Sequence, residues 1–302
     1  MERWVEKNLR YLVLAPTVLI LLGLTIYPTI FLFIISVQDF DLGRPENSTF
    51  VGLANFARLF TDSVFHTALA NTLIFTSVAV TVEFGLGLGF ALLVSRVISG
   101  LSVVRTILLL PMMLPPVAVA VTWKLMFHPF FGVINDVIYS TGLEDLLFNW
   151  GLITEPLGWT FAIEMALLSI IIVDIWEWTP FVFLMMLAAL AGLPSAPYEA
   201  ADLDGANGWQ KFRDLTWPFI RPVVTIVILL RTMDAFRLFD TVVVMTRGGP
   251  GGATDTLSYY TYRMAFRNFD MGYASAMSLA MLAITIVFSL WFIRRMVGQE
   301  EG

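Results

Sequence analysis

The chain has 302 residues, of which 58% are apolar and 14% are charged, and its mean hydropathy is +0.78. Runs of roughly 18 or more nearly uncharged residues accompany this composition, which is typical of a polytopic membrane protein and leaves no length for a separate soluble catalytic domain. The formal charge of -6 argues against binding to nucleic acid, and the absence of cysteine excludes disulfides, thiolate metal sites and a cysteine nucleophile.

Six apolar segments are long enough to be transmembrane helices, since each is near the roughly 20 residues that cross the hydrocarbon. They are Leu12–Val37, Ala68–Val94, Thr106–Phe127, Trp159–Leu190, Phe219–Met245 and Tyr273–Val297. Basic residues precede the first segment, as in a signal peptide, but this segment is too long and lacks a small-residue cleavage site. We therefore expect an all-α fold with an N-terminus at 1–11, a six-span domain at 12–297 and a tail at 298–302.

The orientation of these spans follows from the basic residues that lie between them. An even number of spans puts both termini on one side, together with the larger group of basic residues: Arg3, Lys7, Arg10, Arg96, Arg105, Lys211, Arg213, Arg221, Arg294 and Arg295. The opposite side has the smaller group: Arg44, Arg58, Lys124, Arg237, Arg247, Arg263 and Arg267. Because cytoplasmic loops carry an excess of Lys and Arg, both termini and the loop at 199–222 are expected to be cytoplasmic.

Proline and glycine residues mark special positions within the spans. Pro111, Pro115 and Pro116 interrupt the third span. Such a break is tolerated only where neighbouring helices or water satisfy the freed carbonyl groups, so this span is expected inside a helix bundle. Gly85 and Gly89 lie in an apolar span without the strand and acidic residue of a nucleotide fingerprint, and they predict close helix packing.

Motifs for catalysis or metal binding are missing from the sequence. No GxxxxGK followed by Ser or Thr is present to cradle phosphates, and His66 and His128 are widely separated without an HExxH pattern. An intramembrane enzyme would need paired catalytic groups at helical spacing, and neither a Ser/His arrangement nor a metal-binding cluster occurs. We therefore expect no metal site and no enzymatic activity.

The segment at 199–222 is polar although apolar spans flank it. Ser195 is expected as the N-cap and Pro197 at an early position of a short helix. Gly205 and Gly208 then allow a sharp change of direction, after which a second helix leads into the fifth span. From spacing alone, the segment is either a helix–turn–helix on the membrane surface or an ordinary glycine-rich loop.

Charged residues of alternating sign occupy every third position late in the fifth span: Arg231, Asp234, Arg237 and Asp240. A charge at the centre of a bilayer costs about 2.5–3.5 kcal/mol on insertion scales, so these side chains should face the bundle interior, a solute pathway or a partner chain. One interpretation is a salt-bridge ladder or a contact between subunits, which is favoured because neighbouring charges can pair. The other is a solute route bordered by Asp234, Arg237 and Asp240.

A second set of carboxylates within the spans comprises Glu83, Glu164, Asp174 and Glu177. Unpaired acids at this depth mark proton or ion routes in secondary transporters, so an ion-coupled carrier is an alternative. Such carriers commonly have internal repeats, and no clear repeat is present. We therefore expect these carboxylates to pair with arginines of the fifth span or with a partner subunit.

The polar loop at 199–222 has the sequence EAADLDGANGWQKFRDLTWPFIRP. It resembles the EAA loop of the permease subunits of ABC importers. Glu199, Ala200, Ala201, Gly205 and Pro218 fall on the positions of that pattern. Further motifs are similar to the carbohydrate-importer branch, whose subunits partner as a MalF-like and MalG-like pair. These motifs are FVGLANFARLFTD, ALANTLIFT, LLLPMMLPPVAVAVTWKLMFHPFFGVIN, WEWTPFVFLMMLAALAGLP and FDTVVVMTRGGPGGATDTLSYYTY.

The resemblance implies the type I ABC importer permease fold, a location in a bacterial or archaeal cytoplasmic membrane, and a role as half of a translocation pathway. Besides membrane lipid, the implied partners are a second, MalG-like permease subunit, a dimer of cytoplasmic ATPase subunits and an extracytoplasmic sugar-binding protein. The loop at 195–217 would dock on the ATPase through Glu199, Ala200, Ala201, Asp204 and Gly205. This chain itself would need no cofactor, because ATP and Mg would bind the ATPase.

The solute pathway is expected to include Trp176 together with Asp234, Arg237 and Asp240. Aromatic rings can stack on sugar faces, although tryptophan is also common at membrane interfaces. The other candidate rings are those of Trp123, Trp178 and Tyr259. The alternative function is an ion-coupled secondary sugar carrier that acts without an ATPase.

Overall fold

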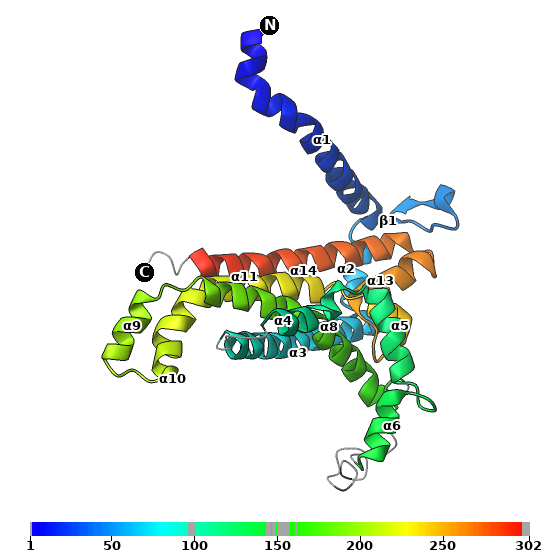
Figure 1. Ribbon diagram of the computed structural model, residues 1–302. Helices are drawn as coiled ribbons and strands as arrows, with labels where there is room; N and C mark the ends of the chain where they lie inside the picture. Colours follow the sequence, from blue (N-terminus) through cyan, green and yellow to red (C-terminus); the bar gives the residue numbers. More distant parts are fainter. Residues whose placement is uncertain are drawn as a thin grey trace. The chain divides into compact units, whose positions relative to one another are not determined.

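The computed structural model describes residues 2–95, 101–142, 146, 149, 158–160 and 162–297 (Figure 1). The chain divides into two compact units. The first unit comprises the residues up to Ser63 together with Thr261–Ala283, and the second comprises Val64–Tyr260 with the residues from Ile284 onward. Regular structure in the described residues is almost entirely helical, as the composition predicts.

The first unit begins with α1 (Glu2–Ser36), and a small hairpin follows it. In this hairpin β1 (Gln38–Asp39) pairs antiparallel with β2 (Thr49–Phe50), and a 3-10 turn at Pro45–Asn47 lies between them. α2 (Ala54–Leu59) then leads toward the start of the next long helix. The end of α13 (Leu257–Phe266) and the start of α14 (Met271–Val297) complete the unit.

The second unit is built around α8 (Ile163–Ala191), which packs with α3 (Ser63–Val94) and α11 (Trp217–Ala235). The apolar residues of these three helices share one buried core: Ala91, Val94, Val182, Phe183, Met186, Leu187, Ile220, Val224 and Val227. Because lipid tails are as apolar as these side chains, close van der Waals packing stabilises the contact of the three helices. The polar groups described below are therefore held on a packed scaffold.

Shorter helices lie beside this bundle and at its two ends. α4 (Leu101–Leu109) and α5 (Pro116–Met126) contact α8, α6 (Val133–Ser140) follows α5, and α12 (Asp240–Met245) contacts α5. At the opposite end of the bundle, α9 (Ala196–Leu203) and α10 (Gly208–Lys211) lie together between α8 and α11 in the chain (Figure 1).

Four helices in the described residues are long and apolar enough to cross a membrane: Val13–Ser36, Ser63–Val94, Met165–Ala191 and Met271–Arg294. They confirm the first, second, fourth and sixth predicted spans as long apolar helices. The third span is divided, as its prolines predict, because α4 ends at Leu109 and a 3-10 turn at Pro111–Met113 precedes α5. The total of six spans stays a prediction.

The prediction of the fifth span as one helix over Phe219–Met245 is wrong. α11 ends at Ala235, and α12 begins only at Asp240. The carbonyl of Leu238 accepts a hydrogen bond from the hydroxyl of Thr256 at 3.0 Å instead of from a later backbone amide. A side chain that lies far along the chain therefore satisfies a carbonyl that a continuing helix would use.

The prediction of close packing at Gly85 and Gly89 is also wrong within this chain. A Cβ atom added at either position would meet no atom of the described residues within 4 Å. At Gly87, by contrast, an added Cβ would lie 2.7 Å from the Cβ atom of Val182. The close approach of α3 and α8 therefore requires the middle glycine of the three.

Candidate functional site

The predicted coupling segment folds as two short helices with a turn between them. α9 begins at Ala196, with Pro197 and Glu199 in its first turn, as predicted. Ser195 occupies the N-cap position, but its backbone is already helical and its side chain makes no capping hydrogen bond. The prediction therefore placed the start of the helix correctly, but it was wrong that the Ser195 side chain caps it.

The turn after α9 depends on Gly205, whose φ of +75° lies in the left-handed region that favours glycine. The second helix starts from a capping box at Asn207: the Asn207 side chain accepts from the Gln210 backbone amide at 3.0 Å, and the Gln210 side chain accepts from the Asn207 amide at 2.8 Å. Sequence reasoning missed this cap, although an Asn followed three residues later by Gln signals it.

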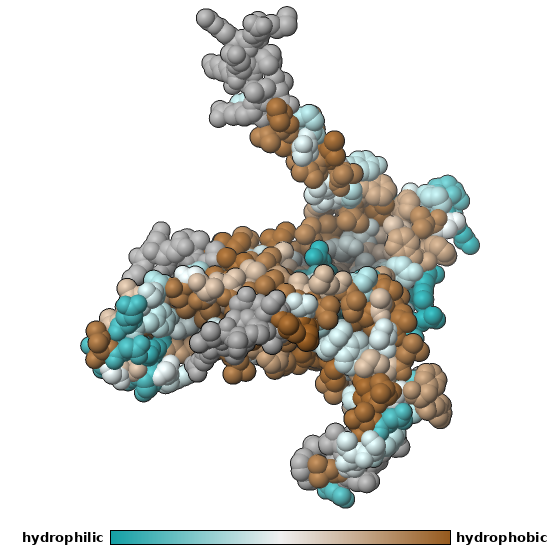
Figure 2. Space-filling model, viewed as in Figure 1, coloured by the Kyte–Doolittle hydropathy of each residue, from teal (hydrophilic) through white to brown (hydrophobic). Residues whose placement is uncertain are grey.

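The outer surface of the coupling segment is exposed and partly apolar. Glu199, Ala200, Asp204 and Gly205 are exposed, whereas Ala201 is half-buried. Two large apolar side chains of the segment, Leu203 and Trp209, are also exposed. Figure 2 shows brown apolar atoms among teal hydrophilic ones at this end of the bundle. Four of the five predicted coupling residues thus lie on a surface that a second protein could cover.

Two side-chain contacts tie α9 to the chain that leads into α11. The hydroxyls of Tyr198 and Thr216 share a hydrogen bond of 2.9 Å, and Lys211 forms an ion pair with Asp202. Residues Phe212–Thr216 form a π-helical turn directly before α11, a feature that often occurs at functional sites in helices. These contacts therefore join α9 to α10 and to the π-helical turn that leads into α11.

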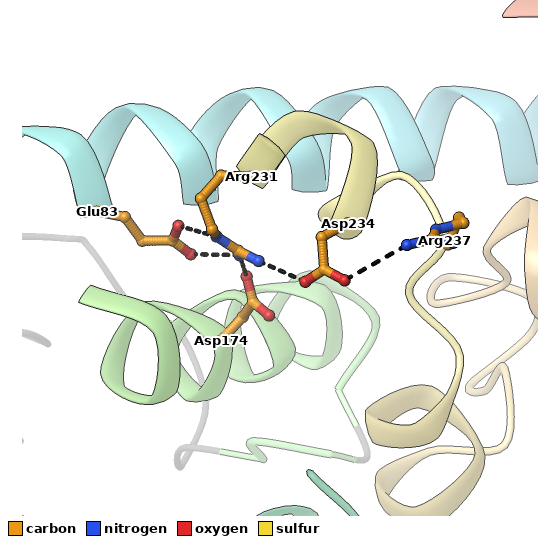
Figure 3. Close-up of polar contacts among 5 residues, drawn as sticks. All are labelled: Glu83, Asp174, Arg231, Asp234 and Arg237. Carbon is orange, nitrogen blue, oxygen red and sulfur yellow. Dashed lines mark hydrogen bonds and ion pairs between the residues drawn. The ribbon is translucent and has the colours of Figure 1, made fainter. Parts of the chain in front are cut away.

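A buried arginine organises the charges within the bundle (Figure 3). Arg231 of α11 is only 2% exposed, and its guanidinium donates to both carboxylate oxygens of Glu83 in α3 at 2.7 and 2.9 Å. It also donates to Asp174 of α8 at 2.8 Å and to Asp234 at 2.7 Å. One guanidinium thus joins three helices, which confirms the prediction that Glu83 and Asp174 pair with an arginine of the fifth span.

The remaining members of the two charged sets have different surroundings. Asp234 pairs with Arg231 at 2.7 Å and with Arg237 at 3.8 Å, as the ladder interpretation predicts, although Arg237 lies beyond the end of α11 (Figure 3). Glu177 is 2% exposed, and its Oε1 atom has no hydrogen-bond partner in the described part of the chain. The side chain of Glu164 lies outside the described residues.

A cavity of about 260 Å³ brings together several of these groups. Its lining contains Asp234, Arg237 and Asp240, which the sequence predicts to border a solute route, together with Asp174, Glu177, Trp178 and Pro116. Trp178 also supports the arginine cluster, since the Arg231 guanidinium lies 4.9 Å from its ring centroid. This polar cavity therefore offers carboxylates, one guanidinium and one indole to a solute.

Trp176 lies elsewhere, in a separate apolar cavity of about 490 Å³. Its ring meets that of Trp123 edge to face, with 5.6 Å between centroids, and both rings line that cavity. Tyr259, another candidate ring, is buried against Phe239 and does not present a free face. The structure thus does not bring Trp176 or Tyr259 to the polar cavity, and of the candidate aromatic rings it places Trp178 there.

Comparison with known proteins gives relatives over the whole length. The trehalose/maltose transport system permease protein MalF of Thermococcus litoralis is 34% identical over 295 residues, 97% of this chain and 95% of that protein. The trehalose transport system permease protein SugA of Mycobacterium tuberculosis is 32% identical, over 100% of this chain and 92% of its own. The sulfoquinovosyl glycerol transport system permease protein SmoG of Agrobacterium fabrum is 32% identical, over 97% of this chain and 92% of that protein.

Solved structures share the fold. A chain of a bacterial ABC transporter that imports the acidic polysaccharide alginate aligns with a TM-score of 0.82 and 23% identity, over 98% of both chains. A chain of the alginate transporter in complex with an alginate pentasaccharide-bound periplasmic protein aligns with a TM-score of 0.80. Residues 83–294 match the family described as Binding-protein-dependent transport system inner membrane component, so the chain belongs to this family and has the ABC importer permease fold.

Proposed function

We propose that this chain is one of two permease subunits of an ATP-driven carbohydrate importer, and that it forms half of the translocation pathway. The observation that carries this proposal is the exposed coupling segment at 195–217. Its side-chain contacts join α9 to the turn that leads into α11, in a chain whose relatives are sugar-transport permeases. The partners would be a second, MalG-like permease, a dimer of cytoplasmic ATPase subunits and an extracytoplasmic sugar-binding protein.

The coupling segment would transmit movement of the ATPase to the helices in the membrane. Glu199, Ala200, Asp204 and Gly205 lie at the surface, and the small side chain of Ala200 permits close approach of another protein. When the ATPase subunits close, movement of α9 would pass through Tyr198 and Thr216 to α11. ATP and Mg would bind the ATPase, and this chain would contribute no cofactor.

We place the solute beside the polar cavity of Asp234, Arg237 and Asp240. Carboxylates accept hydrogen bonds from sugar hydroxyls, and the Arg237 guanidinium donates them. Glu177 adds a buried oxygen that has no hydrogen-bond partner among the described residues. A solute hydroxyl at Glu177 would satisfy a group whose burial is otherwise costly. Because Trp176 lines the separate apolar cavity, its part in the pathway rests on the sequence prediction alone.

The orientation in the bacterial or archaeal cytoplasmic membrane follows from the same proposal. The coupling segment must reach the ATPase, so it lies in the cytoplasm, and an even number of spans puts both termini on that side. Six spans are proposed: the four long apolar helices, the divided segment of α4 and α5, and α11.

Uptake of a panel of labelled sugars by the reconstituted complex tests the function. The complex would be purified through this chain, and uptake would be measured with and without ATP and the binding protein. We expect co-purification of a second permease and an ATPase, and uptake of a carbohydrate that requires ATP. Uptake by this chain alone, driven by an ion gradient, would instead support the secondary carrier.

A further inference from the structure

The connection between the first two apolar helices folds back onto the end of α1. The Val51 amide donates to the Val37 carbonyl at 2.9 Å, and β-pairing places Phe50 opposite Gln38. The side-chain amide of Asn55 donates to the carbonyls of Ser36 and Gln38 at 3.0 and 2.8 Å. Since the last carbonyls of a helix lack partners within it, Asn55 both satisfies the end of α1 and fixes α2 beside it.

Four large apolar side chains of this connection are exposed, and Leu42, at 42%, is the least exposed of them. We refer to the other three as the apolar triad: Phe50 at 78%, Leu53 at 71% and Phe60 at 80%. Leu53 and Phe60 are the N-cap and C-cap residues of α2, and their spacing of seven positions puts them on the same side of the helix. The other face of α2 carries Asn55 and the buried Leu59 toward the rest of the unit. The helix thus has a satisfied inner face and an apolar outer face.

The triad lies close in the chain to the residues at which the first candidate span ends and the second begins. Phe50 pairs with Gln38, which follows the last residue of the first span, Ser36, by two positions. Phe60 precedes Ser63, where the second span begins, by three positions, so the two Cα atoms are at most roughly 10 Å apart. The interfacial layer on each side of the hydrocarbon is about 5–7 Å thick, so chain distances of this size put the triad within reach of the lipid headgroups.

Ionic and aromatic contacts hold α2 in this orientation. Arg58 forms an ion pair with Asp270 at 2.7 Å, and its guanidinium lies 3.9 Å above the ring centroid of Tyr273. Tyr273 in turn donates to the Asp62 carboxylate at 2.7 Å. Because Asp270 and Tyr273 both hold the Arg58 guanidinium, α2 is fixed with its apolar face outward.

We propose that the apolar triad inserts into the outer interfacial layer of the bilayer and that its partner is lipid. Helices that lie in a membrane surface present Phe, Leu and Trp toward the acyl chains and keep polar groups on the other face, as α2 does. Lipid removes these three side chains from water without any further protein. The connection is thus a surface anchor that sets the level at which α1 leaves the membrane.

The absence of native cysteine permits a direct test. Single variants Phe50→Cys, Leu53→Cys and Phe60→Cys would carry a nitroxide label in the purified importer complex reconstituted in lipid nanodiscs. Asn47→Cys, an exposed polar position in the turn of the same hairpin, is the matched control. The complex with the unsubstituted chain gives the background from cysteines of other subunits.

We expect labels at the triad to collide readily with oxygen, which concentrates in lipid, and poorly with a water-soluble nickel chelate. The ratio of oxygen to nickel accessibility should therefore be higher at all three positions than at Asn47. Equal nickel accessibility at the triad and at Asn47 would overturn the proposal, since the triad would then face water. Low accessibility to both reagents would overturn it as well, because the triad would then be covered by protein.

Discussion

The Glu83 carboxylate accepts two hydrogen bonds from the Arg231 guanidinium, at 2.7 and 2.9 Å, although 148 positions separate the two residues. The pair joins α3 to α11, and the bond from Arg231 to Asp174 adds α8. A buried guanidinium with three carboxylate partners is stable only while the partners remain, since each lost partner leaves an uncompensated charge in a region of low dielectric constant. The cluster therefore holds the three helices in one arrangement.

Replacing Arg231 should destabilise the subunit strongly. Arg231→Ala leaves Glu83 and Asp174 buried without their partner, and loss of one member of a buried ion pair costs about 3–5 kcal/mol. The measurement is the thermal unfolding midpoint of the purified complex, which should fall markedly.

Arg237→Ala is the matched control for this prediction, because Arg237 is exposed and lies 3.8 Å from Asp234. Removal of the Arg237 side chain should change the free energy of unfolding by at most about 0.5 kcal/mol, as for other exposed ion pairs. Similar midpoints for the two variants would show that the buried cluster does not hold the helices together.

Gly205→Pro should uncouple ATP hydrolysis from uptake. Proline holds φ near -65°, whereas Gly205 has a φ of +75°, and the Gly205 amide also donates to the Asp202 carbonyl at 3.2 Å. The turn between α9 and α10 would rearrange, while the spans should still insert. The readout is the number of ATP molecules hydrolysed for each sugar imported, which we expect to rise.

Gly208→Ala provides the comparison on the same segment. A Cβ atom at Gly208 meets no described atom within 4 Å, and its φ is not among the positive values, so alanine should be tolerated. Normal transport by Gly205→Pro, or equal defects in both variants, would count against the proposed role of this turn.

Tyr198 and Thr216 should act as one unit in coupling. Tyr198→Phe and Thr216→Val each remove the hydrogen bond of 2.9 Å, which contributes about 0.5–1.5 kcal/mol. Because both changes delete the same bond, their effects on the ratio of ATP hydrolysis to uptake should not add in the double variant. Additive effects would mean that the two hydroxyls act independently and that α9 moves α11 by another route.

The sequence predicts the long apolar helices and the coupling segment because their signals are local. Hydropathy over about 20 residues is sufficient for α1, α3, α8 and α14. Gly205 also follows from local chemistry, since only glycine readily adopts its backbone conformation. The break after Ala235 has no such local signal, because charged residues continue at every third position beyond it. The carbonyl of Leu238, which the break frees, accepts a hydrogen bond from the distant hydroxyl of Thr256.

In the candidate site, local sequence patterns could not predict which cavity Trp176 and Glu177 would line. Successive residues on a helix point about 100° apart, so these neighbours enter separate cavities. Which of the two cavities holds the charged groups depends on the rotation of α8 against α11, which no local pattern contains. For the same reason the sequence did not distinguish Gly87, which faces Val182, from Gly85 and Gly89.

Glu177→Gln should impair solute transfer without loss of stability. The Glu177 Oε1 atom has no hydrogen-bond partner in the described part of the chain, so no internal hydrogen bond to that atom is lost, and the unfolding midpoint of the complex should stay the same. A hydrogen bond from a solute hydroxyl to a carboxylate exceeds one to a neutral amide by about 1–1.5 kcal/mol, which corresponds to roughly a tenfold loss. We therefore expect sugar uptake at saturating binding protein to fall by about tenfold. The exposed carboxylate of Asp136 on α6 gives the control, since Asp136→Asn changes the same charge at a residue that does not line the polar cavity. Unchanged uptake by Glu177→Gln would remove this residue from the pathway, and a lowered unfolding midpoint would instead assign it to the structural cluster around Arg231.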